Sequence, residues 1–507
     1  MDEAVSLPFV SEQPSVSEMN LDQMTDSLRN LSIASHAKLL PELLSQIFLS
    51  CCDFPIHIPP KLGEAALRLP QVCSAWRQVA LKLPELWANV HISYTDEMSV
   101  RRSTVMLEEW IARAGSDYPL NITVVCPQPF GIAAAETPEL FSGSIVSFIV
   151  ANANRIRHFT VALPFMALRP IFDVPSGSFK VLETAVLEPL IRLSDVTMPD
   201  SEAEFCGWHW PSDSVAFDCS PLLRELSYHV SPLFKLPELE LLIENIMDLA
   251  VMDQTLAVRH QFYAPPLSLP RGTSARLTVV SFPLTALTSD TWCDILAECP
   301  DLTTLAIAIK PSQSLSTPSS MLHLDRLANL ILVAFTGYAH TLLDRLVAPH
   351  LDTFTFLGTT VPVTEFLAFQ TRSSFTLTAF ILTGFLPGDD VLRLFRNLDR
   401  VTEMGIPAIS TEHFPVEFWD GVGRGEILPQ LGFLLLRPTA VQAPVLVDMI
   451  AARWDGLEAS QSGSEVPNFI VQFSDMRAEH MDAIKEEFKK LEKYKESGRE
   501  VSMEVLL

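Results

Sequence analysis

The 507-residue sequence is poor in glycine and in positive charge. It holds only 19 glycines against 37 prolines, so it has few glycine-rich loops of the kind that cradle phosphate groups. Lys and Arg number 36 against 61 Asp and Glu, and the net charge of -25 repels phosphate backbones and anionic lipid headgroups. We therefore expect no nucleic acid and no membrane among its direct partners.

The eight cysteines are not spaced as a disulfide framework. None forms a Cys-x-x-Cys pair, and Cys51 and Cys52 are adjacent, so we expect reduced thiols. No apolar run reaches the 18 or more residues of a membrane span, and the first four residues are acidic where a signal peptide is basic. These observations predict an intracellular protein, cytoplasmic or nuclear.

Hydrophobic residues make up 48% of the chain and charged residues 19%, which is typical of a protein with a large buried core. At about 150 residues per domain, the length predicts about three domains or a long repeat array. The first 37 residues are polar, although Leu21, Met24, Leu28 and Leu31 have the spacing of one short amphipathic helix. We interpret residues 1–37 as a flexible N-terminal arm.

Short helices are predicted from Leu39 to about Val90. Pro41 and Pro70 each suit the first turn of a helix, where the missing N–H costs nothing. A segment of about 50 residues can barely bury its own apolar groups, so it needs a partner or the rest of the chain.

A longer helix is predicted within residues 93–118, which we interpret as a linker helix. Gly115 is placed to end it. Its apolar stripe consists of Val105, Leu107, Trp110, Ile111 and Ala114.

Beyond residue 119 the motif apolar-x-x-apolar-x-apolar recurs at a regular period. The first members of five copies are separated by 25, 25, 24 and 26 residues: Leu277, Leu302, Leu327, Leu351 and Leu377. A strand and a helix in a unit of 20–29 residues resemble a leucine-rich repeat. The unit with a helix over 290–300 ends in Cys-Pro before the next strand and resembles the cysteine-containing class of these repeats.

We therefore predict a leucine-rich-repeat-like domain over residues 119–473, with an irregular α/β domain as the alternative. Two wider gaps, of 44 residues from Phe179 to Leu223 and of 54 residues from Leu223 to Leu277, indicate insertions or skipped units. Residues 474–507 are predicted to be an amphipathic capping helix and a tail, with a partner-binding helix as the alternative. The apolar face of that helix is Met481, Ile484, Phe488 and Leu491.

The first helical segment resembles a known family. Its motif Leu40-Pro41-Glu42-Leu43-Leu44, with Ile47 and Phe48, is followed by Val72-Cys73-Ser74-Ala75-Trp76-Arg77 and by Pro84-Glu85-Leu86-Trp87. These elements resemble the F-box, particularly as it occurs in large families of fungal F-box proteins. The link from 49 to 67 is longer than the usual F-box spacing, and this departure falls on the middle helix.

The resemblance implies a three-helix F-box over residues 38–92, followed by an irregular solenoid of strand-helix units. Such a chain docks on a Skp-type adaptor and, through it, on a cullin-RING ligase, and its repeats hold a target protein. It would be a substrate-recognition subunit that needs no cofactor. The residues expected to bind the adaptor are Leu40, Pro41, Glu42, Ile47, Phe48, Val72 and Trp76.

Two alternatives accompany this hypothesis. Leu44, Ile47 and Trp76 could pack the helical unit together instead of binding a partner. The chain could also be a non-ligase repeat scaffold whose F-box is adaptor-bound or vestigial.

Catalytic and metal motifs are weak. The sequence has no Gly-x-Ser-x-Gly elbow, no phosphate-binding loop, no His-Glu-x-x-His pair and no calcium loop. The glycine cluster Gly421–Gly425 is interpreted as a surface loop. Cys206 and His209 have metal-like spacing but lack two further converging ligands, and residues 205–211 are interpreted as an inserted aromatic loop. We therefore expect no metal and no enzymatic activity.

Overall fold

The computed structural model describes sixteen stretches of the chain. They are residues 39–52, 55–61, 63–94, 96–126, 141, 145–192, 214–228, 231–233, 274–309, 321–334, 340–406, 414–436, 442–459, 468–474, 484–497 and 501–506. The predicted arm 1–37, the aromatic stretch 205–211 with Cys206 and His209, and Met481 lie outside the described residues.

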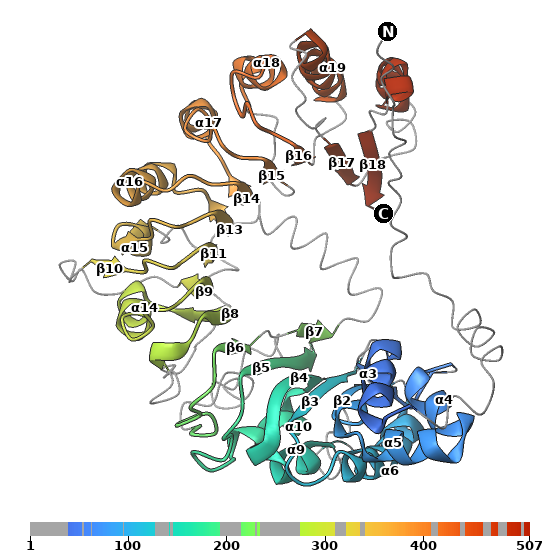
Figure 1. The fold of residues 1–507 in the computed structure, drawn as a ribbon. Helices are drawn as coiled ribbons and strands as arrows, with labels where there is room; N and C mark the ends of the chain where they lie inside the picture. Colours follow the sequence, from blue (N-terminus) through green and yellow to red (C-terminus); the bar gives the residue numbers. More distant parts are fainter. Residues whose placement is uncertain are drawn as a thin grey trace, which may run out of the picture.

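One parallel sheet of 16 strands runs through the described chain from its first strand to its last. Fifteen of the strands lie side by side in chain order, and the short strand Ser231–Leu233 pairs off this path with the strand Thr184–Arg192. The strands line the inner side of an arc, while the helices lie on its outer side (Figure 1). The chain is therefore mixed α/β, as the sequence predicted, and its strands form one large parallel sheet. The sheet also extends beyond both ends of the predicted repeat domain 119–473.

The strands of this sheet are β1 (Ile56–Ile58), β2 (Asn89–Ser93), β3 (Leu120–Val125), β4 (Ile156–Pro164), β5 (Thr184–Arg192), β6 (Glu225–Tyr228), β7 (Ser231–Leu233), β8 (Val279–Leu287), β9 (Thr304–Ile309), β11 (Asn329–Ala334), β13 (Thr353–Thr360), β14 (Ala379–Phe385), β15 (Glu403–Ile406), β16 (Phe433–Leu436), β17 (Asn468–Ser474) and β18 (Val501–Leu506). A separate parallel pair consists of β10 (Leu322–His323) and β12 (Leu346–Val347).

The α-helices are α3 (Pro41–Cys51), α4 (Ala65–Val72), α5 (Ser74–Lys82), α6 (Glu97–Arg113), α9 (Ser147–Ala151), α10 (Phe165–Phe172), α14 (Ser289–Leu296), α15 (His340–Leu343), α16 (Val363–Ser373), α17 (Gly388–Phe395), α18 (Val416–Arg424) and α19 (Ala443–Ala459). Among the described residues there are also four 3₁₀ helices: η2 (Pro84–Leu86), η4 (Ala153–Arg155), η6 (Ser274–Arg276) and η9 (Lys489–Ser497).

A ladder of buried side chains holds the sheet against the helices. One residue of each strand on the main path as far as β17 pairs in register with its counterpart in the next strand, and all of them are buried: Ile56, Val90, Ile122, Phe159, Ala185, Leu226, Val280, Leu305, Leu330, Phe354, Phe380, Met404, Leu434 and Phe469. These are the middle residues of the repeated apolar motif, so the period read from the sequence is the period of the core.

A repeated corner precedes the strands of the central units. The carbonyl of Thr278 accepts hydrogen bonds from the N–H groups of Thr303 (2.8 Å) and Thr304 (3.0 Å). The carbonyls of Thr303, Ala328, Asp352, Thr378 and Thr402 each accept two such bonds from the following unit. Because buried peptide groups must be paired, each corner sets the register of the next strand.

The two wide gaps are insertions, not skipped strands. Strand β5 pairs directly with β6, and β6 pairs directly with β8, so no strand lies between them in the sheet. The unit expected to begin at Phe179 begins at Leu182 instead, because Leu182, Ala185 and Leu187 occupy the buried motif positions.

Several helix predictions are confirmed and others need correction. Helix α14 and helix α6 form where expected, and Gly115 follows α6 with a positive φ of 78°. Val105, however, is exposed and does not belong to the apolar stripe of α6. Pro70 lies inside α4 and not in its first turn.

The glycine cluster lies mostly inside a helix, contrary to the predicted surface loop. Gly421 and Gly423 are buried in α18, and Gly425 ends it in the left-handed conformation. Only a small residue fits at Gly423, since a Cβ there would lie 3.2 Å from the Cβ of Ala452 on α19.

The C-terminal segment also differs from its prediction. Ser474 belongs to β17, and a helical stretch at 484–488 and η9 follow. Ile484, Phe488 and Leu491 are buried there. The predicted tail forms β18, which pairs with β17 and is the edge strand of the sheet.

Candidate protein interaction surface

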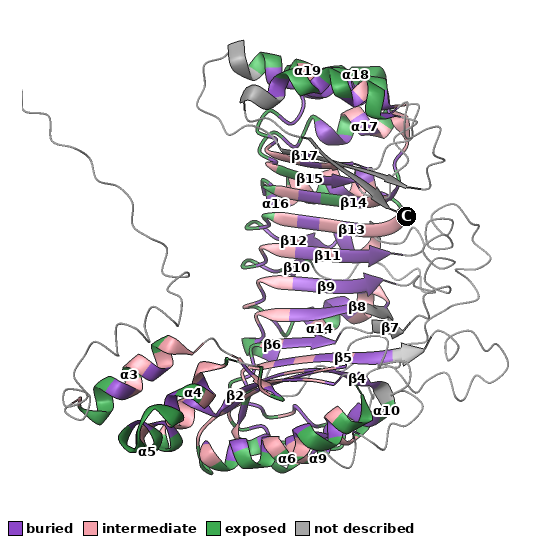
Figure 2. Cartoon of the chain, turned by 90° about the vertical axis from the view of Figure 1, so that its right-hand side faces the viewer, coloured by how far each residue is buried: buried purple, intermediate pink, exposed green. Residues whose placement is uncertain are grey.

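Three short helices near the start of the chain project from the sheet. Helices α3, α4 and α5 lie beyond the ends at which the strands begin, whereas α6 and α9 lie on the outer side of the arc (Figure 2). Strand β1 lies between α3 and α4 in the sequence and pairs with β2, so the unit is attached to the sheet through its own strand.

Helix α3 has apolar residues both on the side that packs against the rest of the protein and on a side that is exposed to solvent. Pro41 occupies its first turn, as predicted, and Leu44 and Phe48 are its buried residues. Leu40, Leu43 and Ile47 follow the neighbouring stripe at spacings of three and four residues. Leu40 is 62% exposed and Leu43 is 51% exposed, while Ile47 is half-buried.

The core of this unit is aromatic. The rings of Phe48 and Trp76 lie 5.1 Å apart, and both side chains are buried. The ring of Trp87 lies 5.4 Å from that of Trp110 on α6, and its indole N–H donates to the carbonyl of Ala80 over 2.8 Å. Phe48 and Trp76 therefore belong to the core of this unit, because their buried rings are not accessible to a partner protein.

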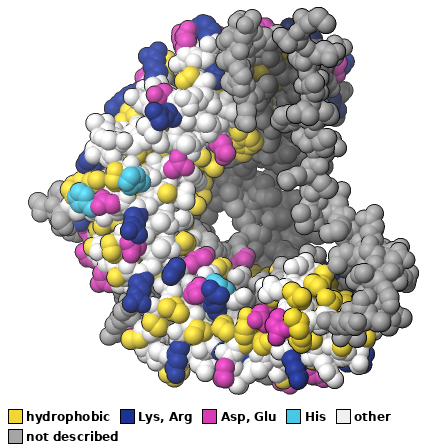
Figure 3. Space-filling model, in the orientation of Figure 1, with side chains coloured by type: hydrophobic (Ala, Val, Ile, Leu, Met, Phe, Trp, Pro, Cys, Tyr) yellow, Lys and Arg dark blue, Asp and Glu magenta, His cyan; other side chains and the backbone are white. Residues whose placement is uncertain are grey.

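The other predicted contact residues lie on the surface. Val72, at the end of α4, is 58% exposed, and Pro41 and Glu42 are exposed as well. Glu42 is the only charged residue of α3. Figure 3 shows hydrophobic side chains gathered over this corner of the molecule. The docking surface of α3 and α4, defined as Leu40, Pro41, Glu42, Leu43 and Val72, is thus apolar with one carboxylate.

Leu43 was missing from the expected contact set although its sequence signal was present. It lies three residues after Leu40 and four before Ile47, on one stripe of the helix. Leu43 and Leu44 both belong to the motif that resembles the F-box, and only their burial in the structure shows that Leu43 is exposed and Leu44 is buried.

The structure also brings together two histidines that the sequence did not connect. His57 and His91 pair in register across β1 and β2, and their rings lie 5.1 Å apart. His57 Nδ1 lies 3.1 Å from Glu64 Oε1, and its Nε2 lies 2.8 Å from Lys61 Nζ. Burial lowers the pKa of His91, and repulsion from His57 and Lys61 lowers it further.

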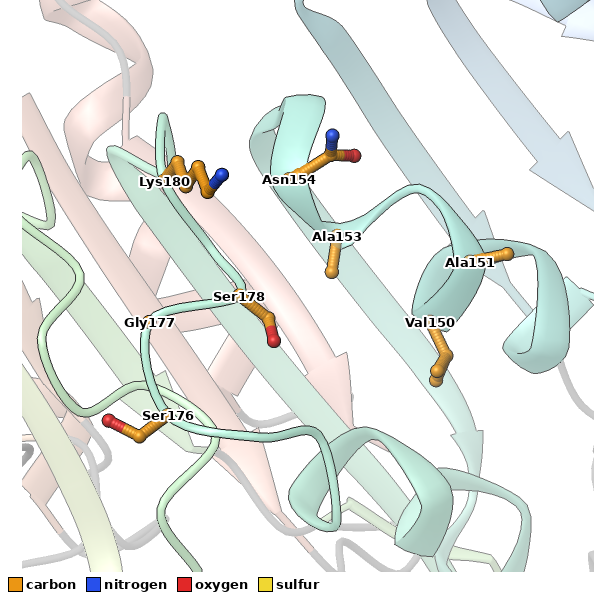
Figure 4. Close-up of a pocket in the computed structure, with 8 residues that line it drawn as sticks. All are labelled: Val150, Ala151, Ala153, Asn154, Ser176, Gly177, Ser178 and Lys180. Carbon is orange, nitrogen blue, oxygen red and sulfur yellow. The ribbon is translucent and has the colours of Figure 1, made fainter.

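A shallow hollow of about 370 Å³ lies between the end of α9 and the turn before β5 (Figure 4). It is lined by Val150, Ala151, Ala153, Asn154, Ser176, Gly177, Ser178 and Lys180. Asn154 and Lys180 lie at one end and Ser176 points away from them (Figure 4). These side chains do not form the nucleophile and base of a catalytic site.

The buried thiols are poor nucleophiles and poor metal ligands. Burial raises the pKa of Cys293 to about 11 and those of Cys126 and Cys299 to about 12, so they stay protonated. Among the residues that the structure describes, no group of three or more His, Cys, Asp or Glu is placed to hold a metal ion.

Within the described stretches, no helix is both long enough and apolar enough to cross a bilayer. A scan of the chain against protein-family models finds no match, and a search of curated proteins finds none either.

Proposed function

We propose that this chain is a substrate-recognition subunit of a Skp-cullin-F-box ubiquitin ligase. Helices α3, α4 and α5 form a fungal-type F-box that docks on a Skp-type adaptor, and an irregular leucine-rich-repeat-like solenoid follows and holds the target. The observation that carries the proposal is the exposed apolar pair of Leu40, the N-cap of α3, and Leu43 in a helix with a single charge, together with exposed Val72.

The energetics support a protein partner for this surface. An exposed amphipathic helix normally turns several charged residues to water, and α3 turns only Glu42. Burying a Leu or Val side chain against a partner contributes about 1.5–3 kcal/mol when the burial is complete. Three such side chains can therefore form the centre of a specific interface.

The ligase role requires no bond chemistry from this chain. A tethered target experiences an effective concentration of about a millimolar around the ubiquitin-charged enzyme.

A capture experiment with purified Skp-type adaptor tests the proposal. The triple variant Leu40→Ser, Leu43→Ser, Val72→Ser should lose at least about a hundredfold in affinity, because it removes the apolar centre while leaving Phe48 and Trp76 in the core. Its circular dichroism and melting temperature should match those of the intact chain.

A matched control replaces exposed apolar residues elsewhere. Met166→Ser on α10 and Val416→Ser on α18 should leave adaptor binding unchanged. If the intact, folded chain does not bind the adaptor, the proposal is refuted. If the adaptor binds but no cullin joins the complex, the chain is an adaptor-bound scaffold and not a ligase subunit.

A further inference from the structure

A carboxylate, an imidazole and an amine lie next to one another at the first strand of the sheet. His57 is the middle residue of β1, and its neighbours Ile56 and Ile58 are buried, so the His57 side chain points to the other face of the strand. Its Nδ1 lies 3.1 Å from Glu64 Oε1, and its Nε2 lies 2.8 Å from Lys61 Nζ. One ring thus connects an acid to an amine.

The turn that follows β1 places both partners of this ring. The peptide N–H of Glu64 donates to the carbonyl of Lys61 over 3.3 Å, and Gly63 lies between them with a φ of 100°. Glycine adopts such a φ at no steric cost. Glu64 is the N-cap of α4, and its side chain is only 15% exposed. The turn therefore presents Glu64 and Lys61 to opposite nitrogens of the same ring.

Glu64 holds the ring of His57 in one orientation and one tautomer. Its Oε1 accepts a hydrogen bond from the peptide N–H of His57 over 3.1 Å as well as contacting Nδ1. A carboxylate only accepts hydrogen bonds and an ammonium group only donates them, so the ring between them carries its hydrogen on Nδ1. The lone pair of Nε2 then faces the Lys61 amine. An imidazolium formed there would be stabilised by the carboxylate of Glu64.

The Lys61 amine is accessible to a reactant. Lys61 is exposed, and a nucleophile beside a base that a third group orients is the usual arrangement of an activated nucleophile in proteins. Imidazole suits the role of base because histidine exchanges its proton near neutral pH. Two other exposed lysines, Lys82 at the end of α5 and Lys180 before β5, have no histidine within hydrogen-bond distance among the described residues.

The chemistry of the three side chains selects the class of reactant. They provide one base and no acid that could protonate a leaving group. An acyl donor must therefore carry a leaving group that departs as an anion near neutral pH. A thiolate does so, because a thiol has a pKa of about 8.5, whereas an alkoxide or an amide nitrogen does not.

We propose that Lys61 is a modification site that accepts the acyl group of a thioester, with His57 as the base and Glu64 as a positioning residue. His57 Nε2 takes one proton from the Lys61 ammonium group and passes it to solvent. The amine then attacks the thioester carbonyl, a C–N bond forms, the C–S bond breaks, and the second proton passes through His57 to the departing thiolate. An ammonium group and a thioester thus give an amide, a thiol and one proton in solvent.

Acylation of the full chain by the small thioester S-acetyl-N-acetylcysteamine tests the inference. Quantitative peptide mass spectrometry after short exposures gives the rate at each lysine of the same sample, so the donor concentration is identical for all of them. We expect Lys61 to react at least about tenfold faster than Lys82 and Lys180.

Variants separate the roles of the three groups. His57→Gln keeps a hydrogen-bonding side chain that cannot take a proton, and it should lower the rate at Lys61 to that at Lys82. Glu64→Gln should lower the rate at Lys61 about threefold, but it should have no further effect in the His57→Gln background, which a merely structural role of Glu64 would not give. The matched control His91→Gln, on β2, should leave the rate unchanged, because the ring of His91 contacts that of His57 and makes no hydrogen bond to Lys61.

Two results would overturn the inference: equal rates at Lys61, Lys82 and Lys180 in the intact chain, or an undiminished rate at Lys61 in His57→Gln. Circular dichroism checks that each variant is folded, and the comparison of lysines within the intact chain decides the question without any variant. Because the experiment uses the chain alone, without adaptor, its outcome is independent of the proposed ligase role.

Discussion

Phe380 on β14 offers a quantitative test of the repeated core. Its side chain is 0% exposed, and its ring lies 5.3 Å from that of Phe366, 5.9 Å from that of Phe354 and 6.4 Å from that of Phe395. Phe380→Ala removes the ring at the meeting point of three units and leaves a cavity. A buried Phe→Ala change costs about 3–5 kcal/mol, and the lost ring contacts place this site toward the upper end of that range.

The matched control lies on the same strand. Phe385 is 49% exposed, so Phe385→Ala should cost less than about 1 kcal/mol. Chemical denaturation followed by far-ultraviolet circular dichroism measures both, and Phe380→Ala should lower the midpoint much further than Phe385→Ala. The reasoning about stacked units fails if the two variants lose equal stability. Because repeat arrays can unfold in parts, a second, earlier transition in Phe380→Ala alone would agree with the prediction.

Two further predictions concern helix packing and pH. Gly423→Leu should destabilise the chain by about 1–3 kcal/mol in thermal or chemical unfolding, because the leucine side chain has no room against α19. Gly456→Ala should instead stabilise it by about 0.5–1 kcal/mol, because a Cβ at that position meets nothing within 4 Å. Burial lowers the pKa of His91, so below about pH 6.5 the unfolded chain takes up a proton that the folded chain resists, and stability falls as the pH falls. His91→Gln should therefore reduce the drop in melting temperature between pH 7.5 and 5.5.

The sequence predicted the central units well because their chemistry is local. A buried strand residue such as Leu305 recurs at a nearly constant spacing in the sequence, since its counterpart in the next strand is Leu330. The corner hydrogen bonds repeat the same pattern in each of these central units. The spacing of Leu302, Leu327 and Leu351 therefore carried both the strand positions and their register. The same signal was lost at β5, where Ala185 occupies a position that a larger apolar residue fills in the other strands of the ladder.

Other features depend on contacts between distant parts of the chain, which spacing alone does not show. The five-residue strand β2 and the three-residue strand β1 are too short for a clear period, and they are placed by pairing with β3 and with each other. The sequence around Phe48 and Trp76 would be the same whether these residues pack against each other or contact a partner. Their assignment needed the 5.1 Å ring contact.

The proposed docking helices and the inner face belong to one continuous sheet. Strand β1 lies between α3 and α4 in the chain and pairs with β2, and β2 pairs with β3. The sheet is therefore continuous across the predicted domain boundary near residue 92. The helix expected to act as a linker, α6, packs against the unit through Trp110 and Trp87. A flexible linker would let a bound target sample a wide volume around the adaptor, and its effective concentration would fall accordingly. Here the paired strands of one sheet fix the position of α3 relative to the inner face. If the proposed function holds, the sheet therefore also fixes the position of the target relative to the adaptor.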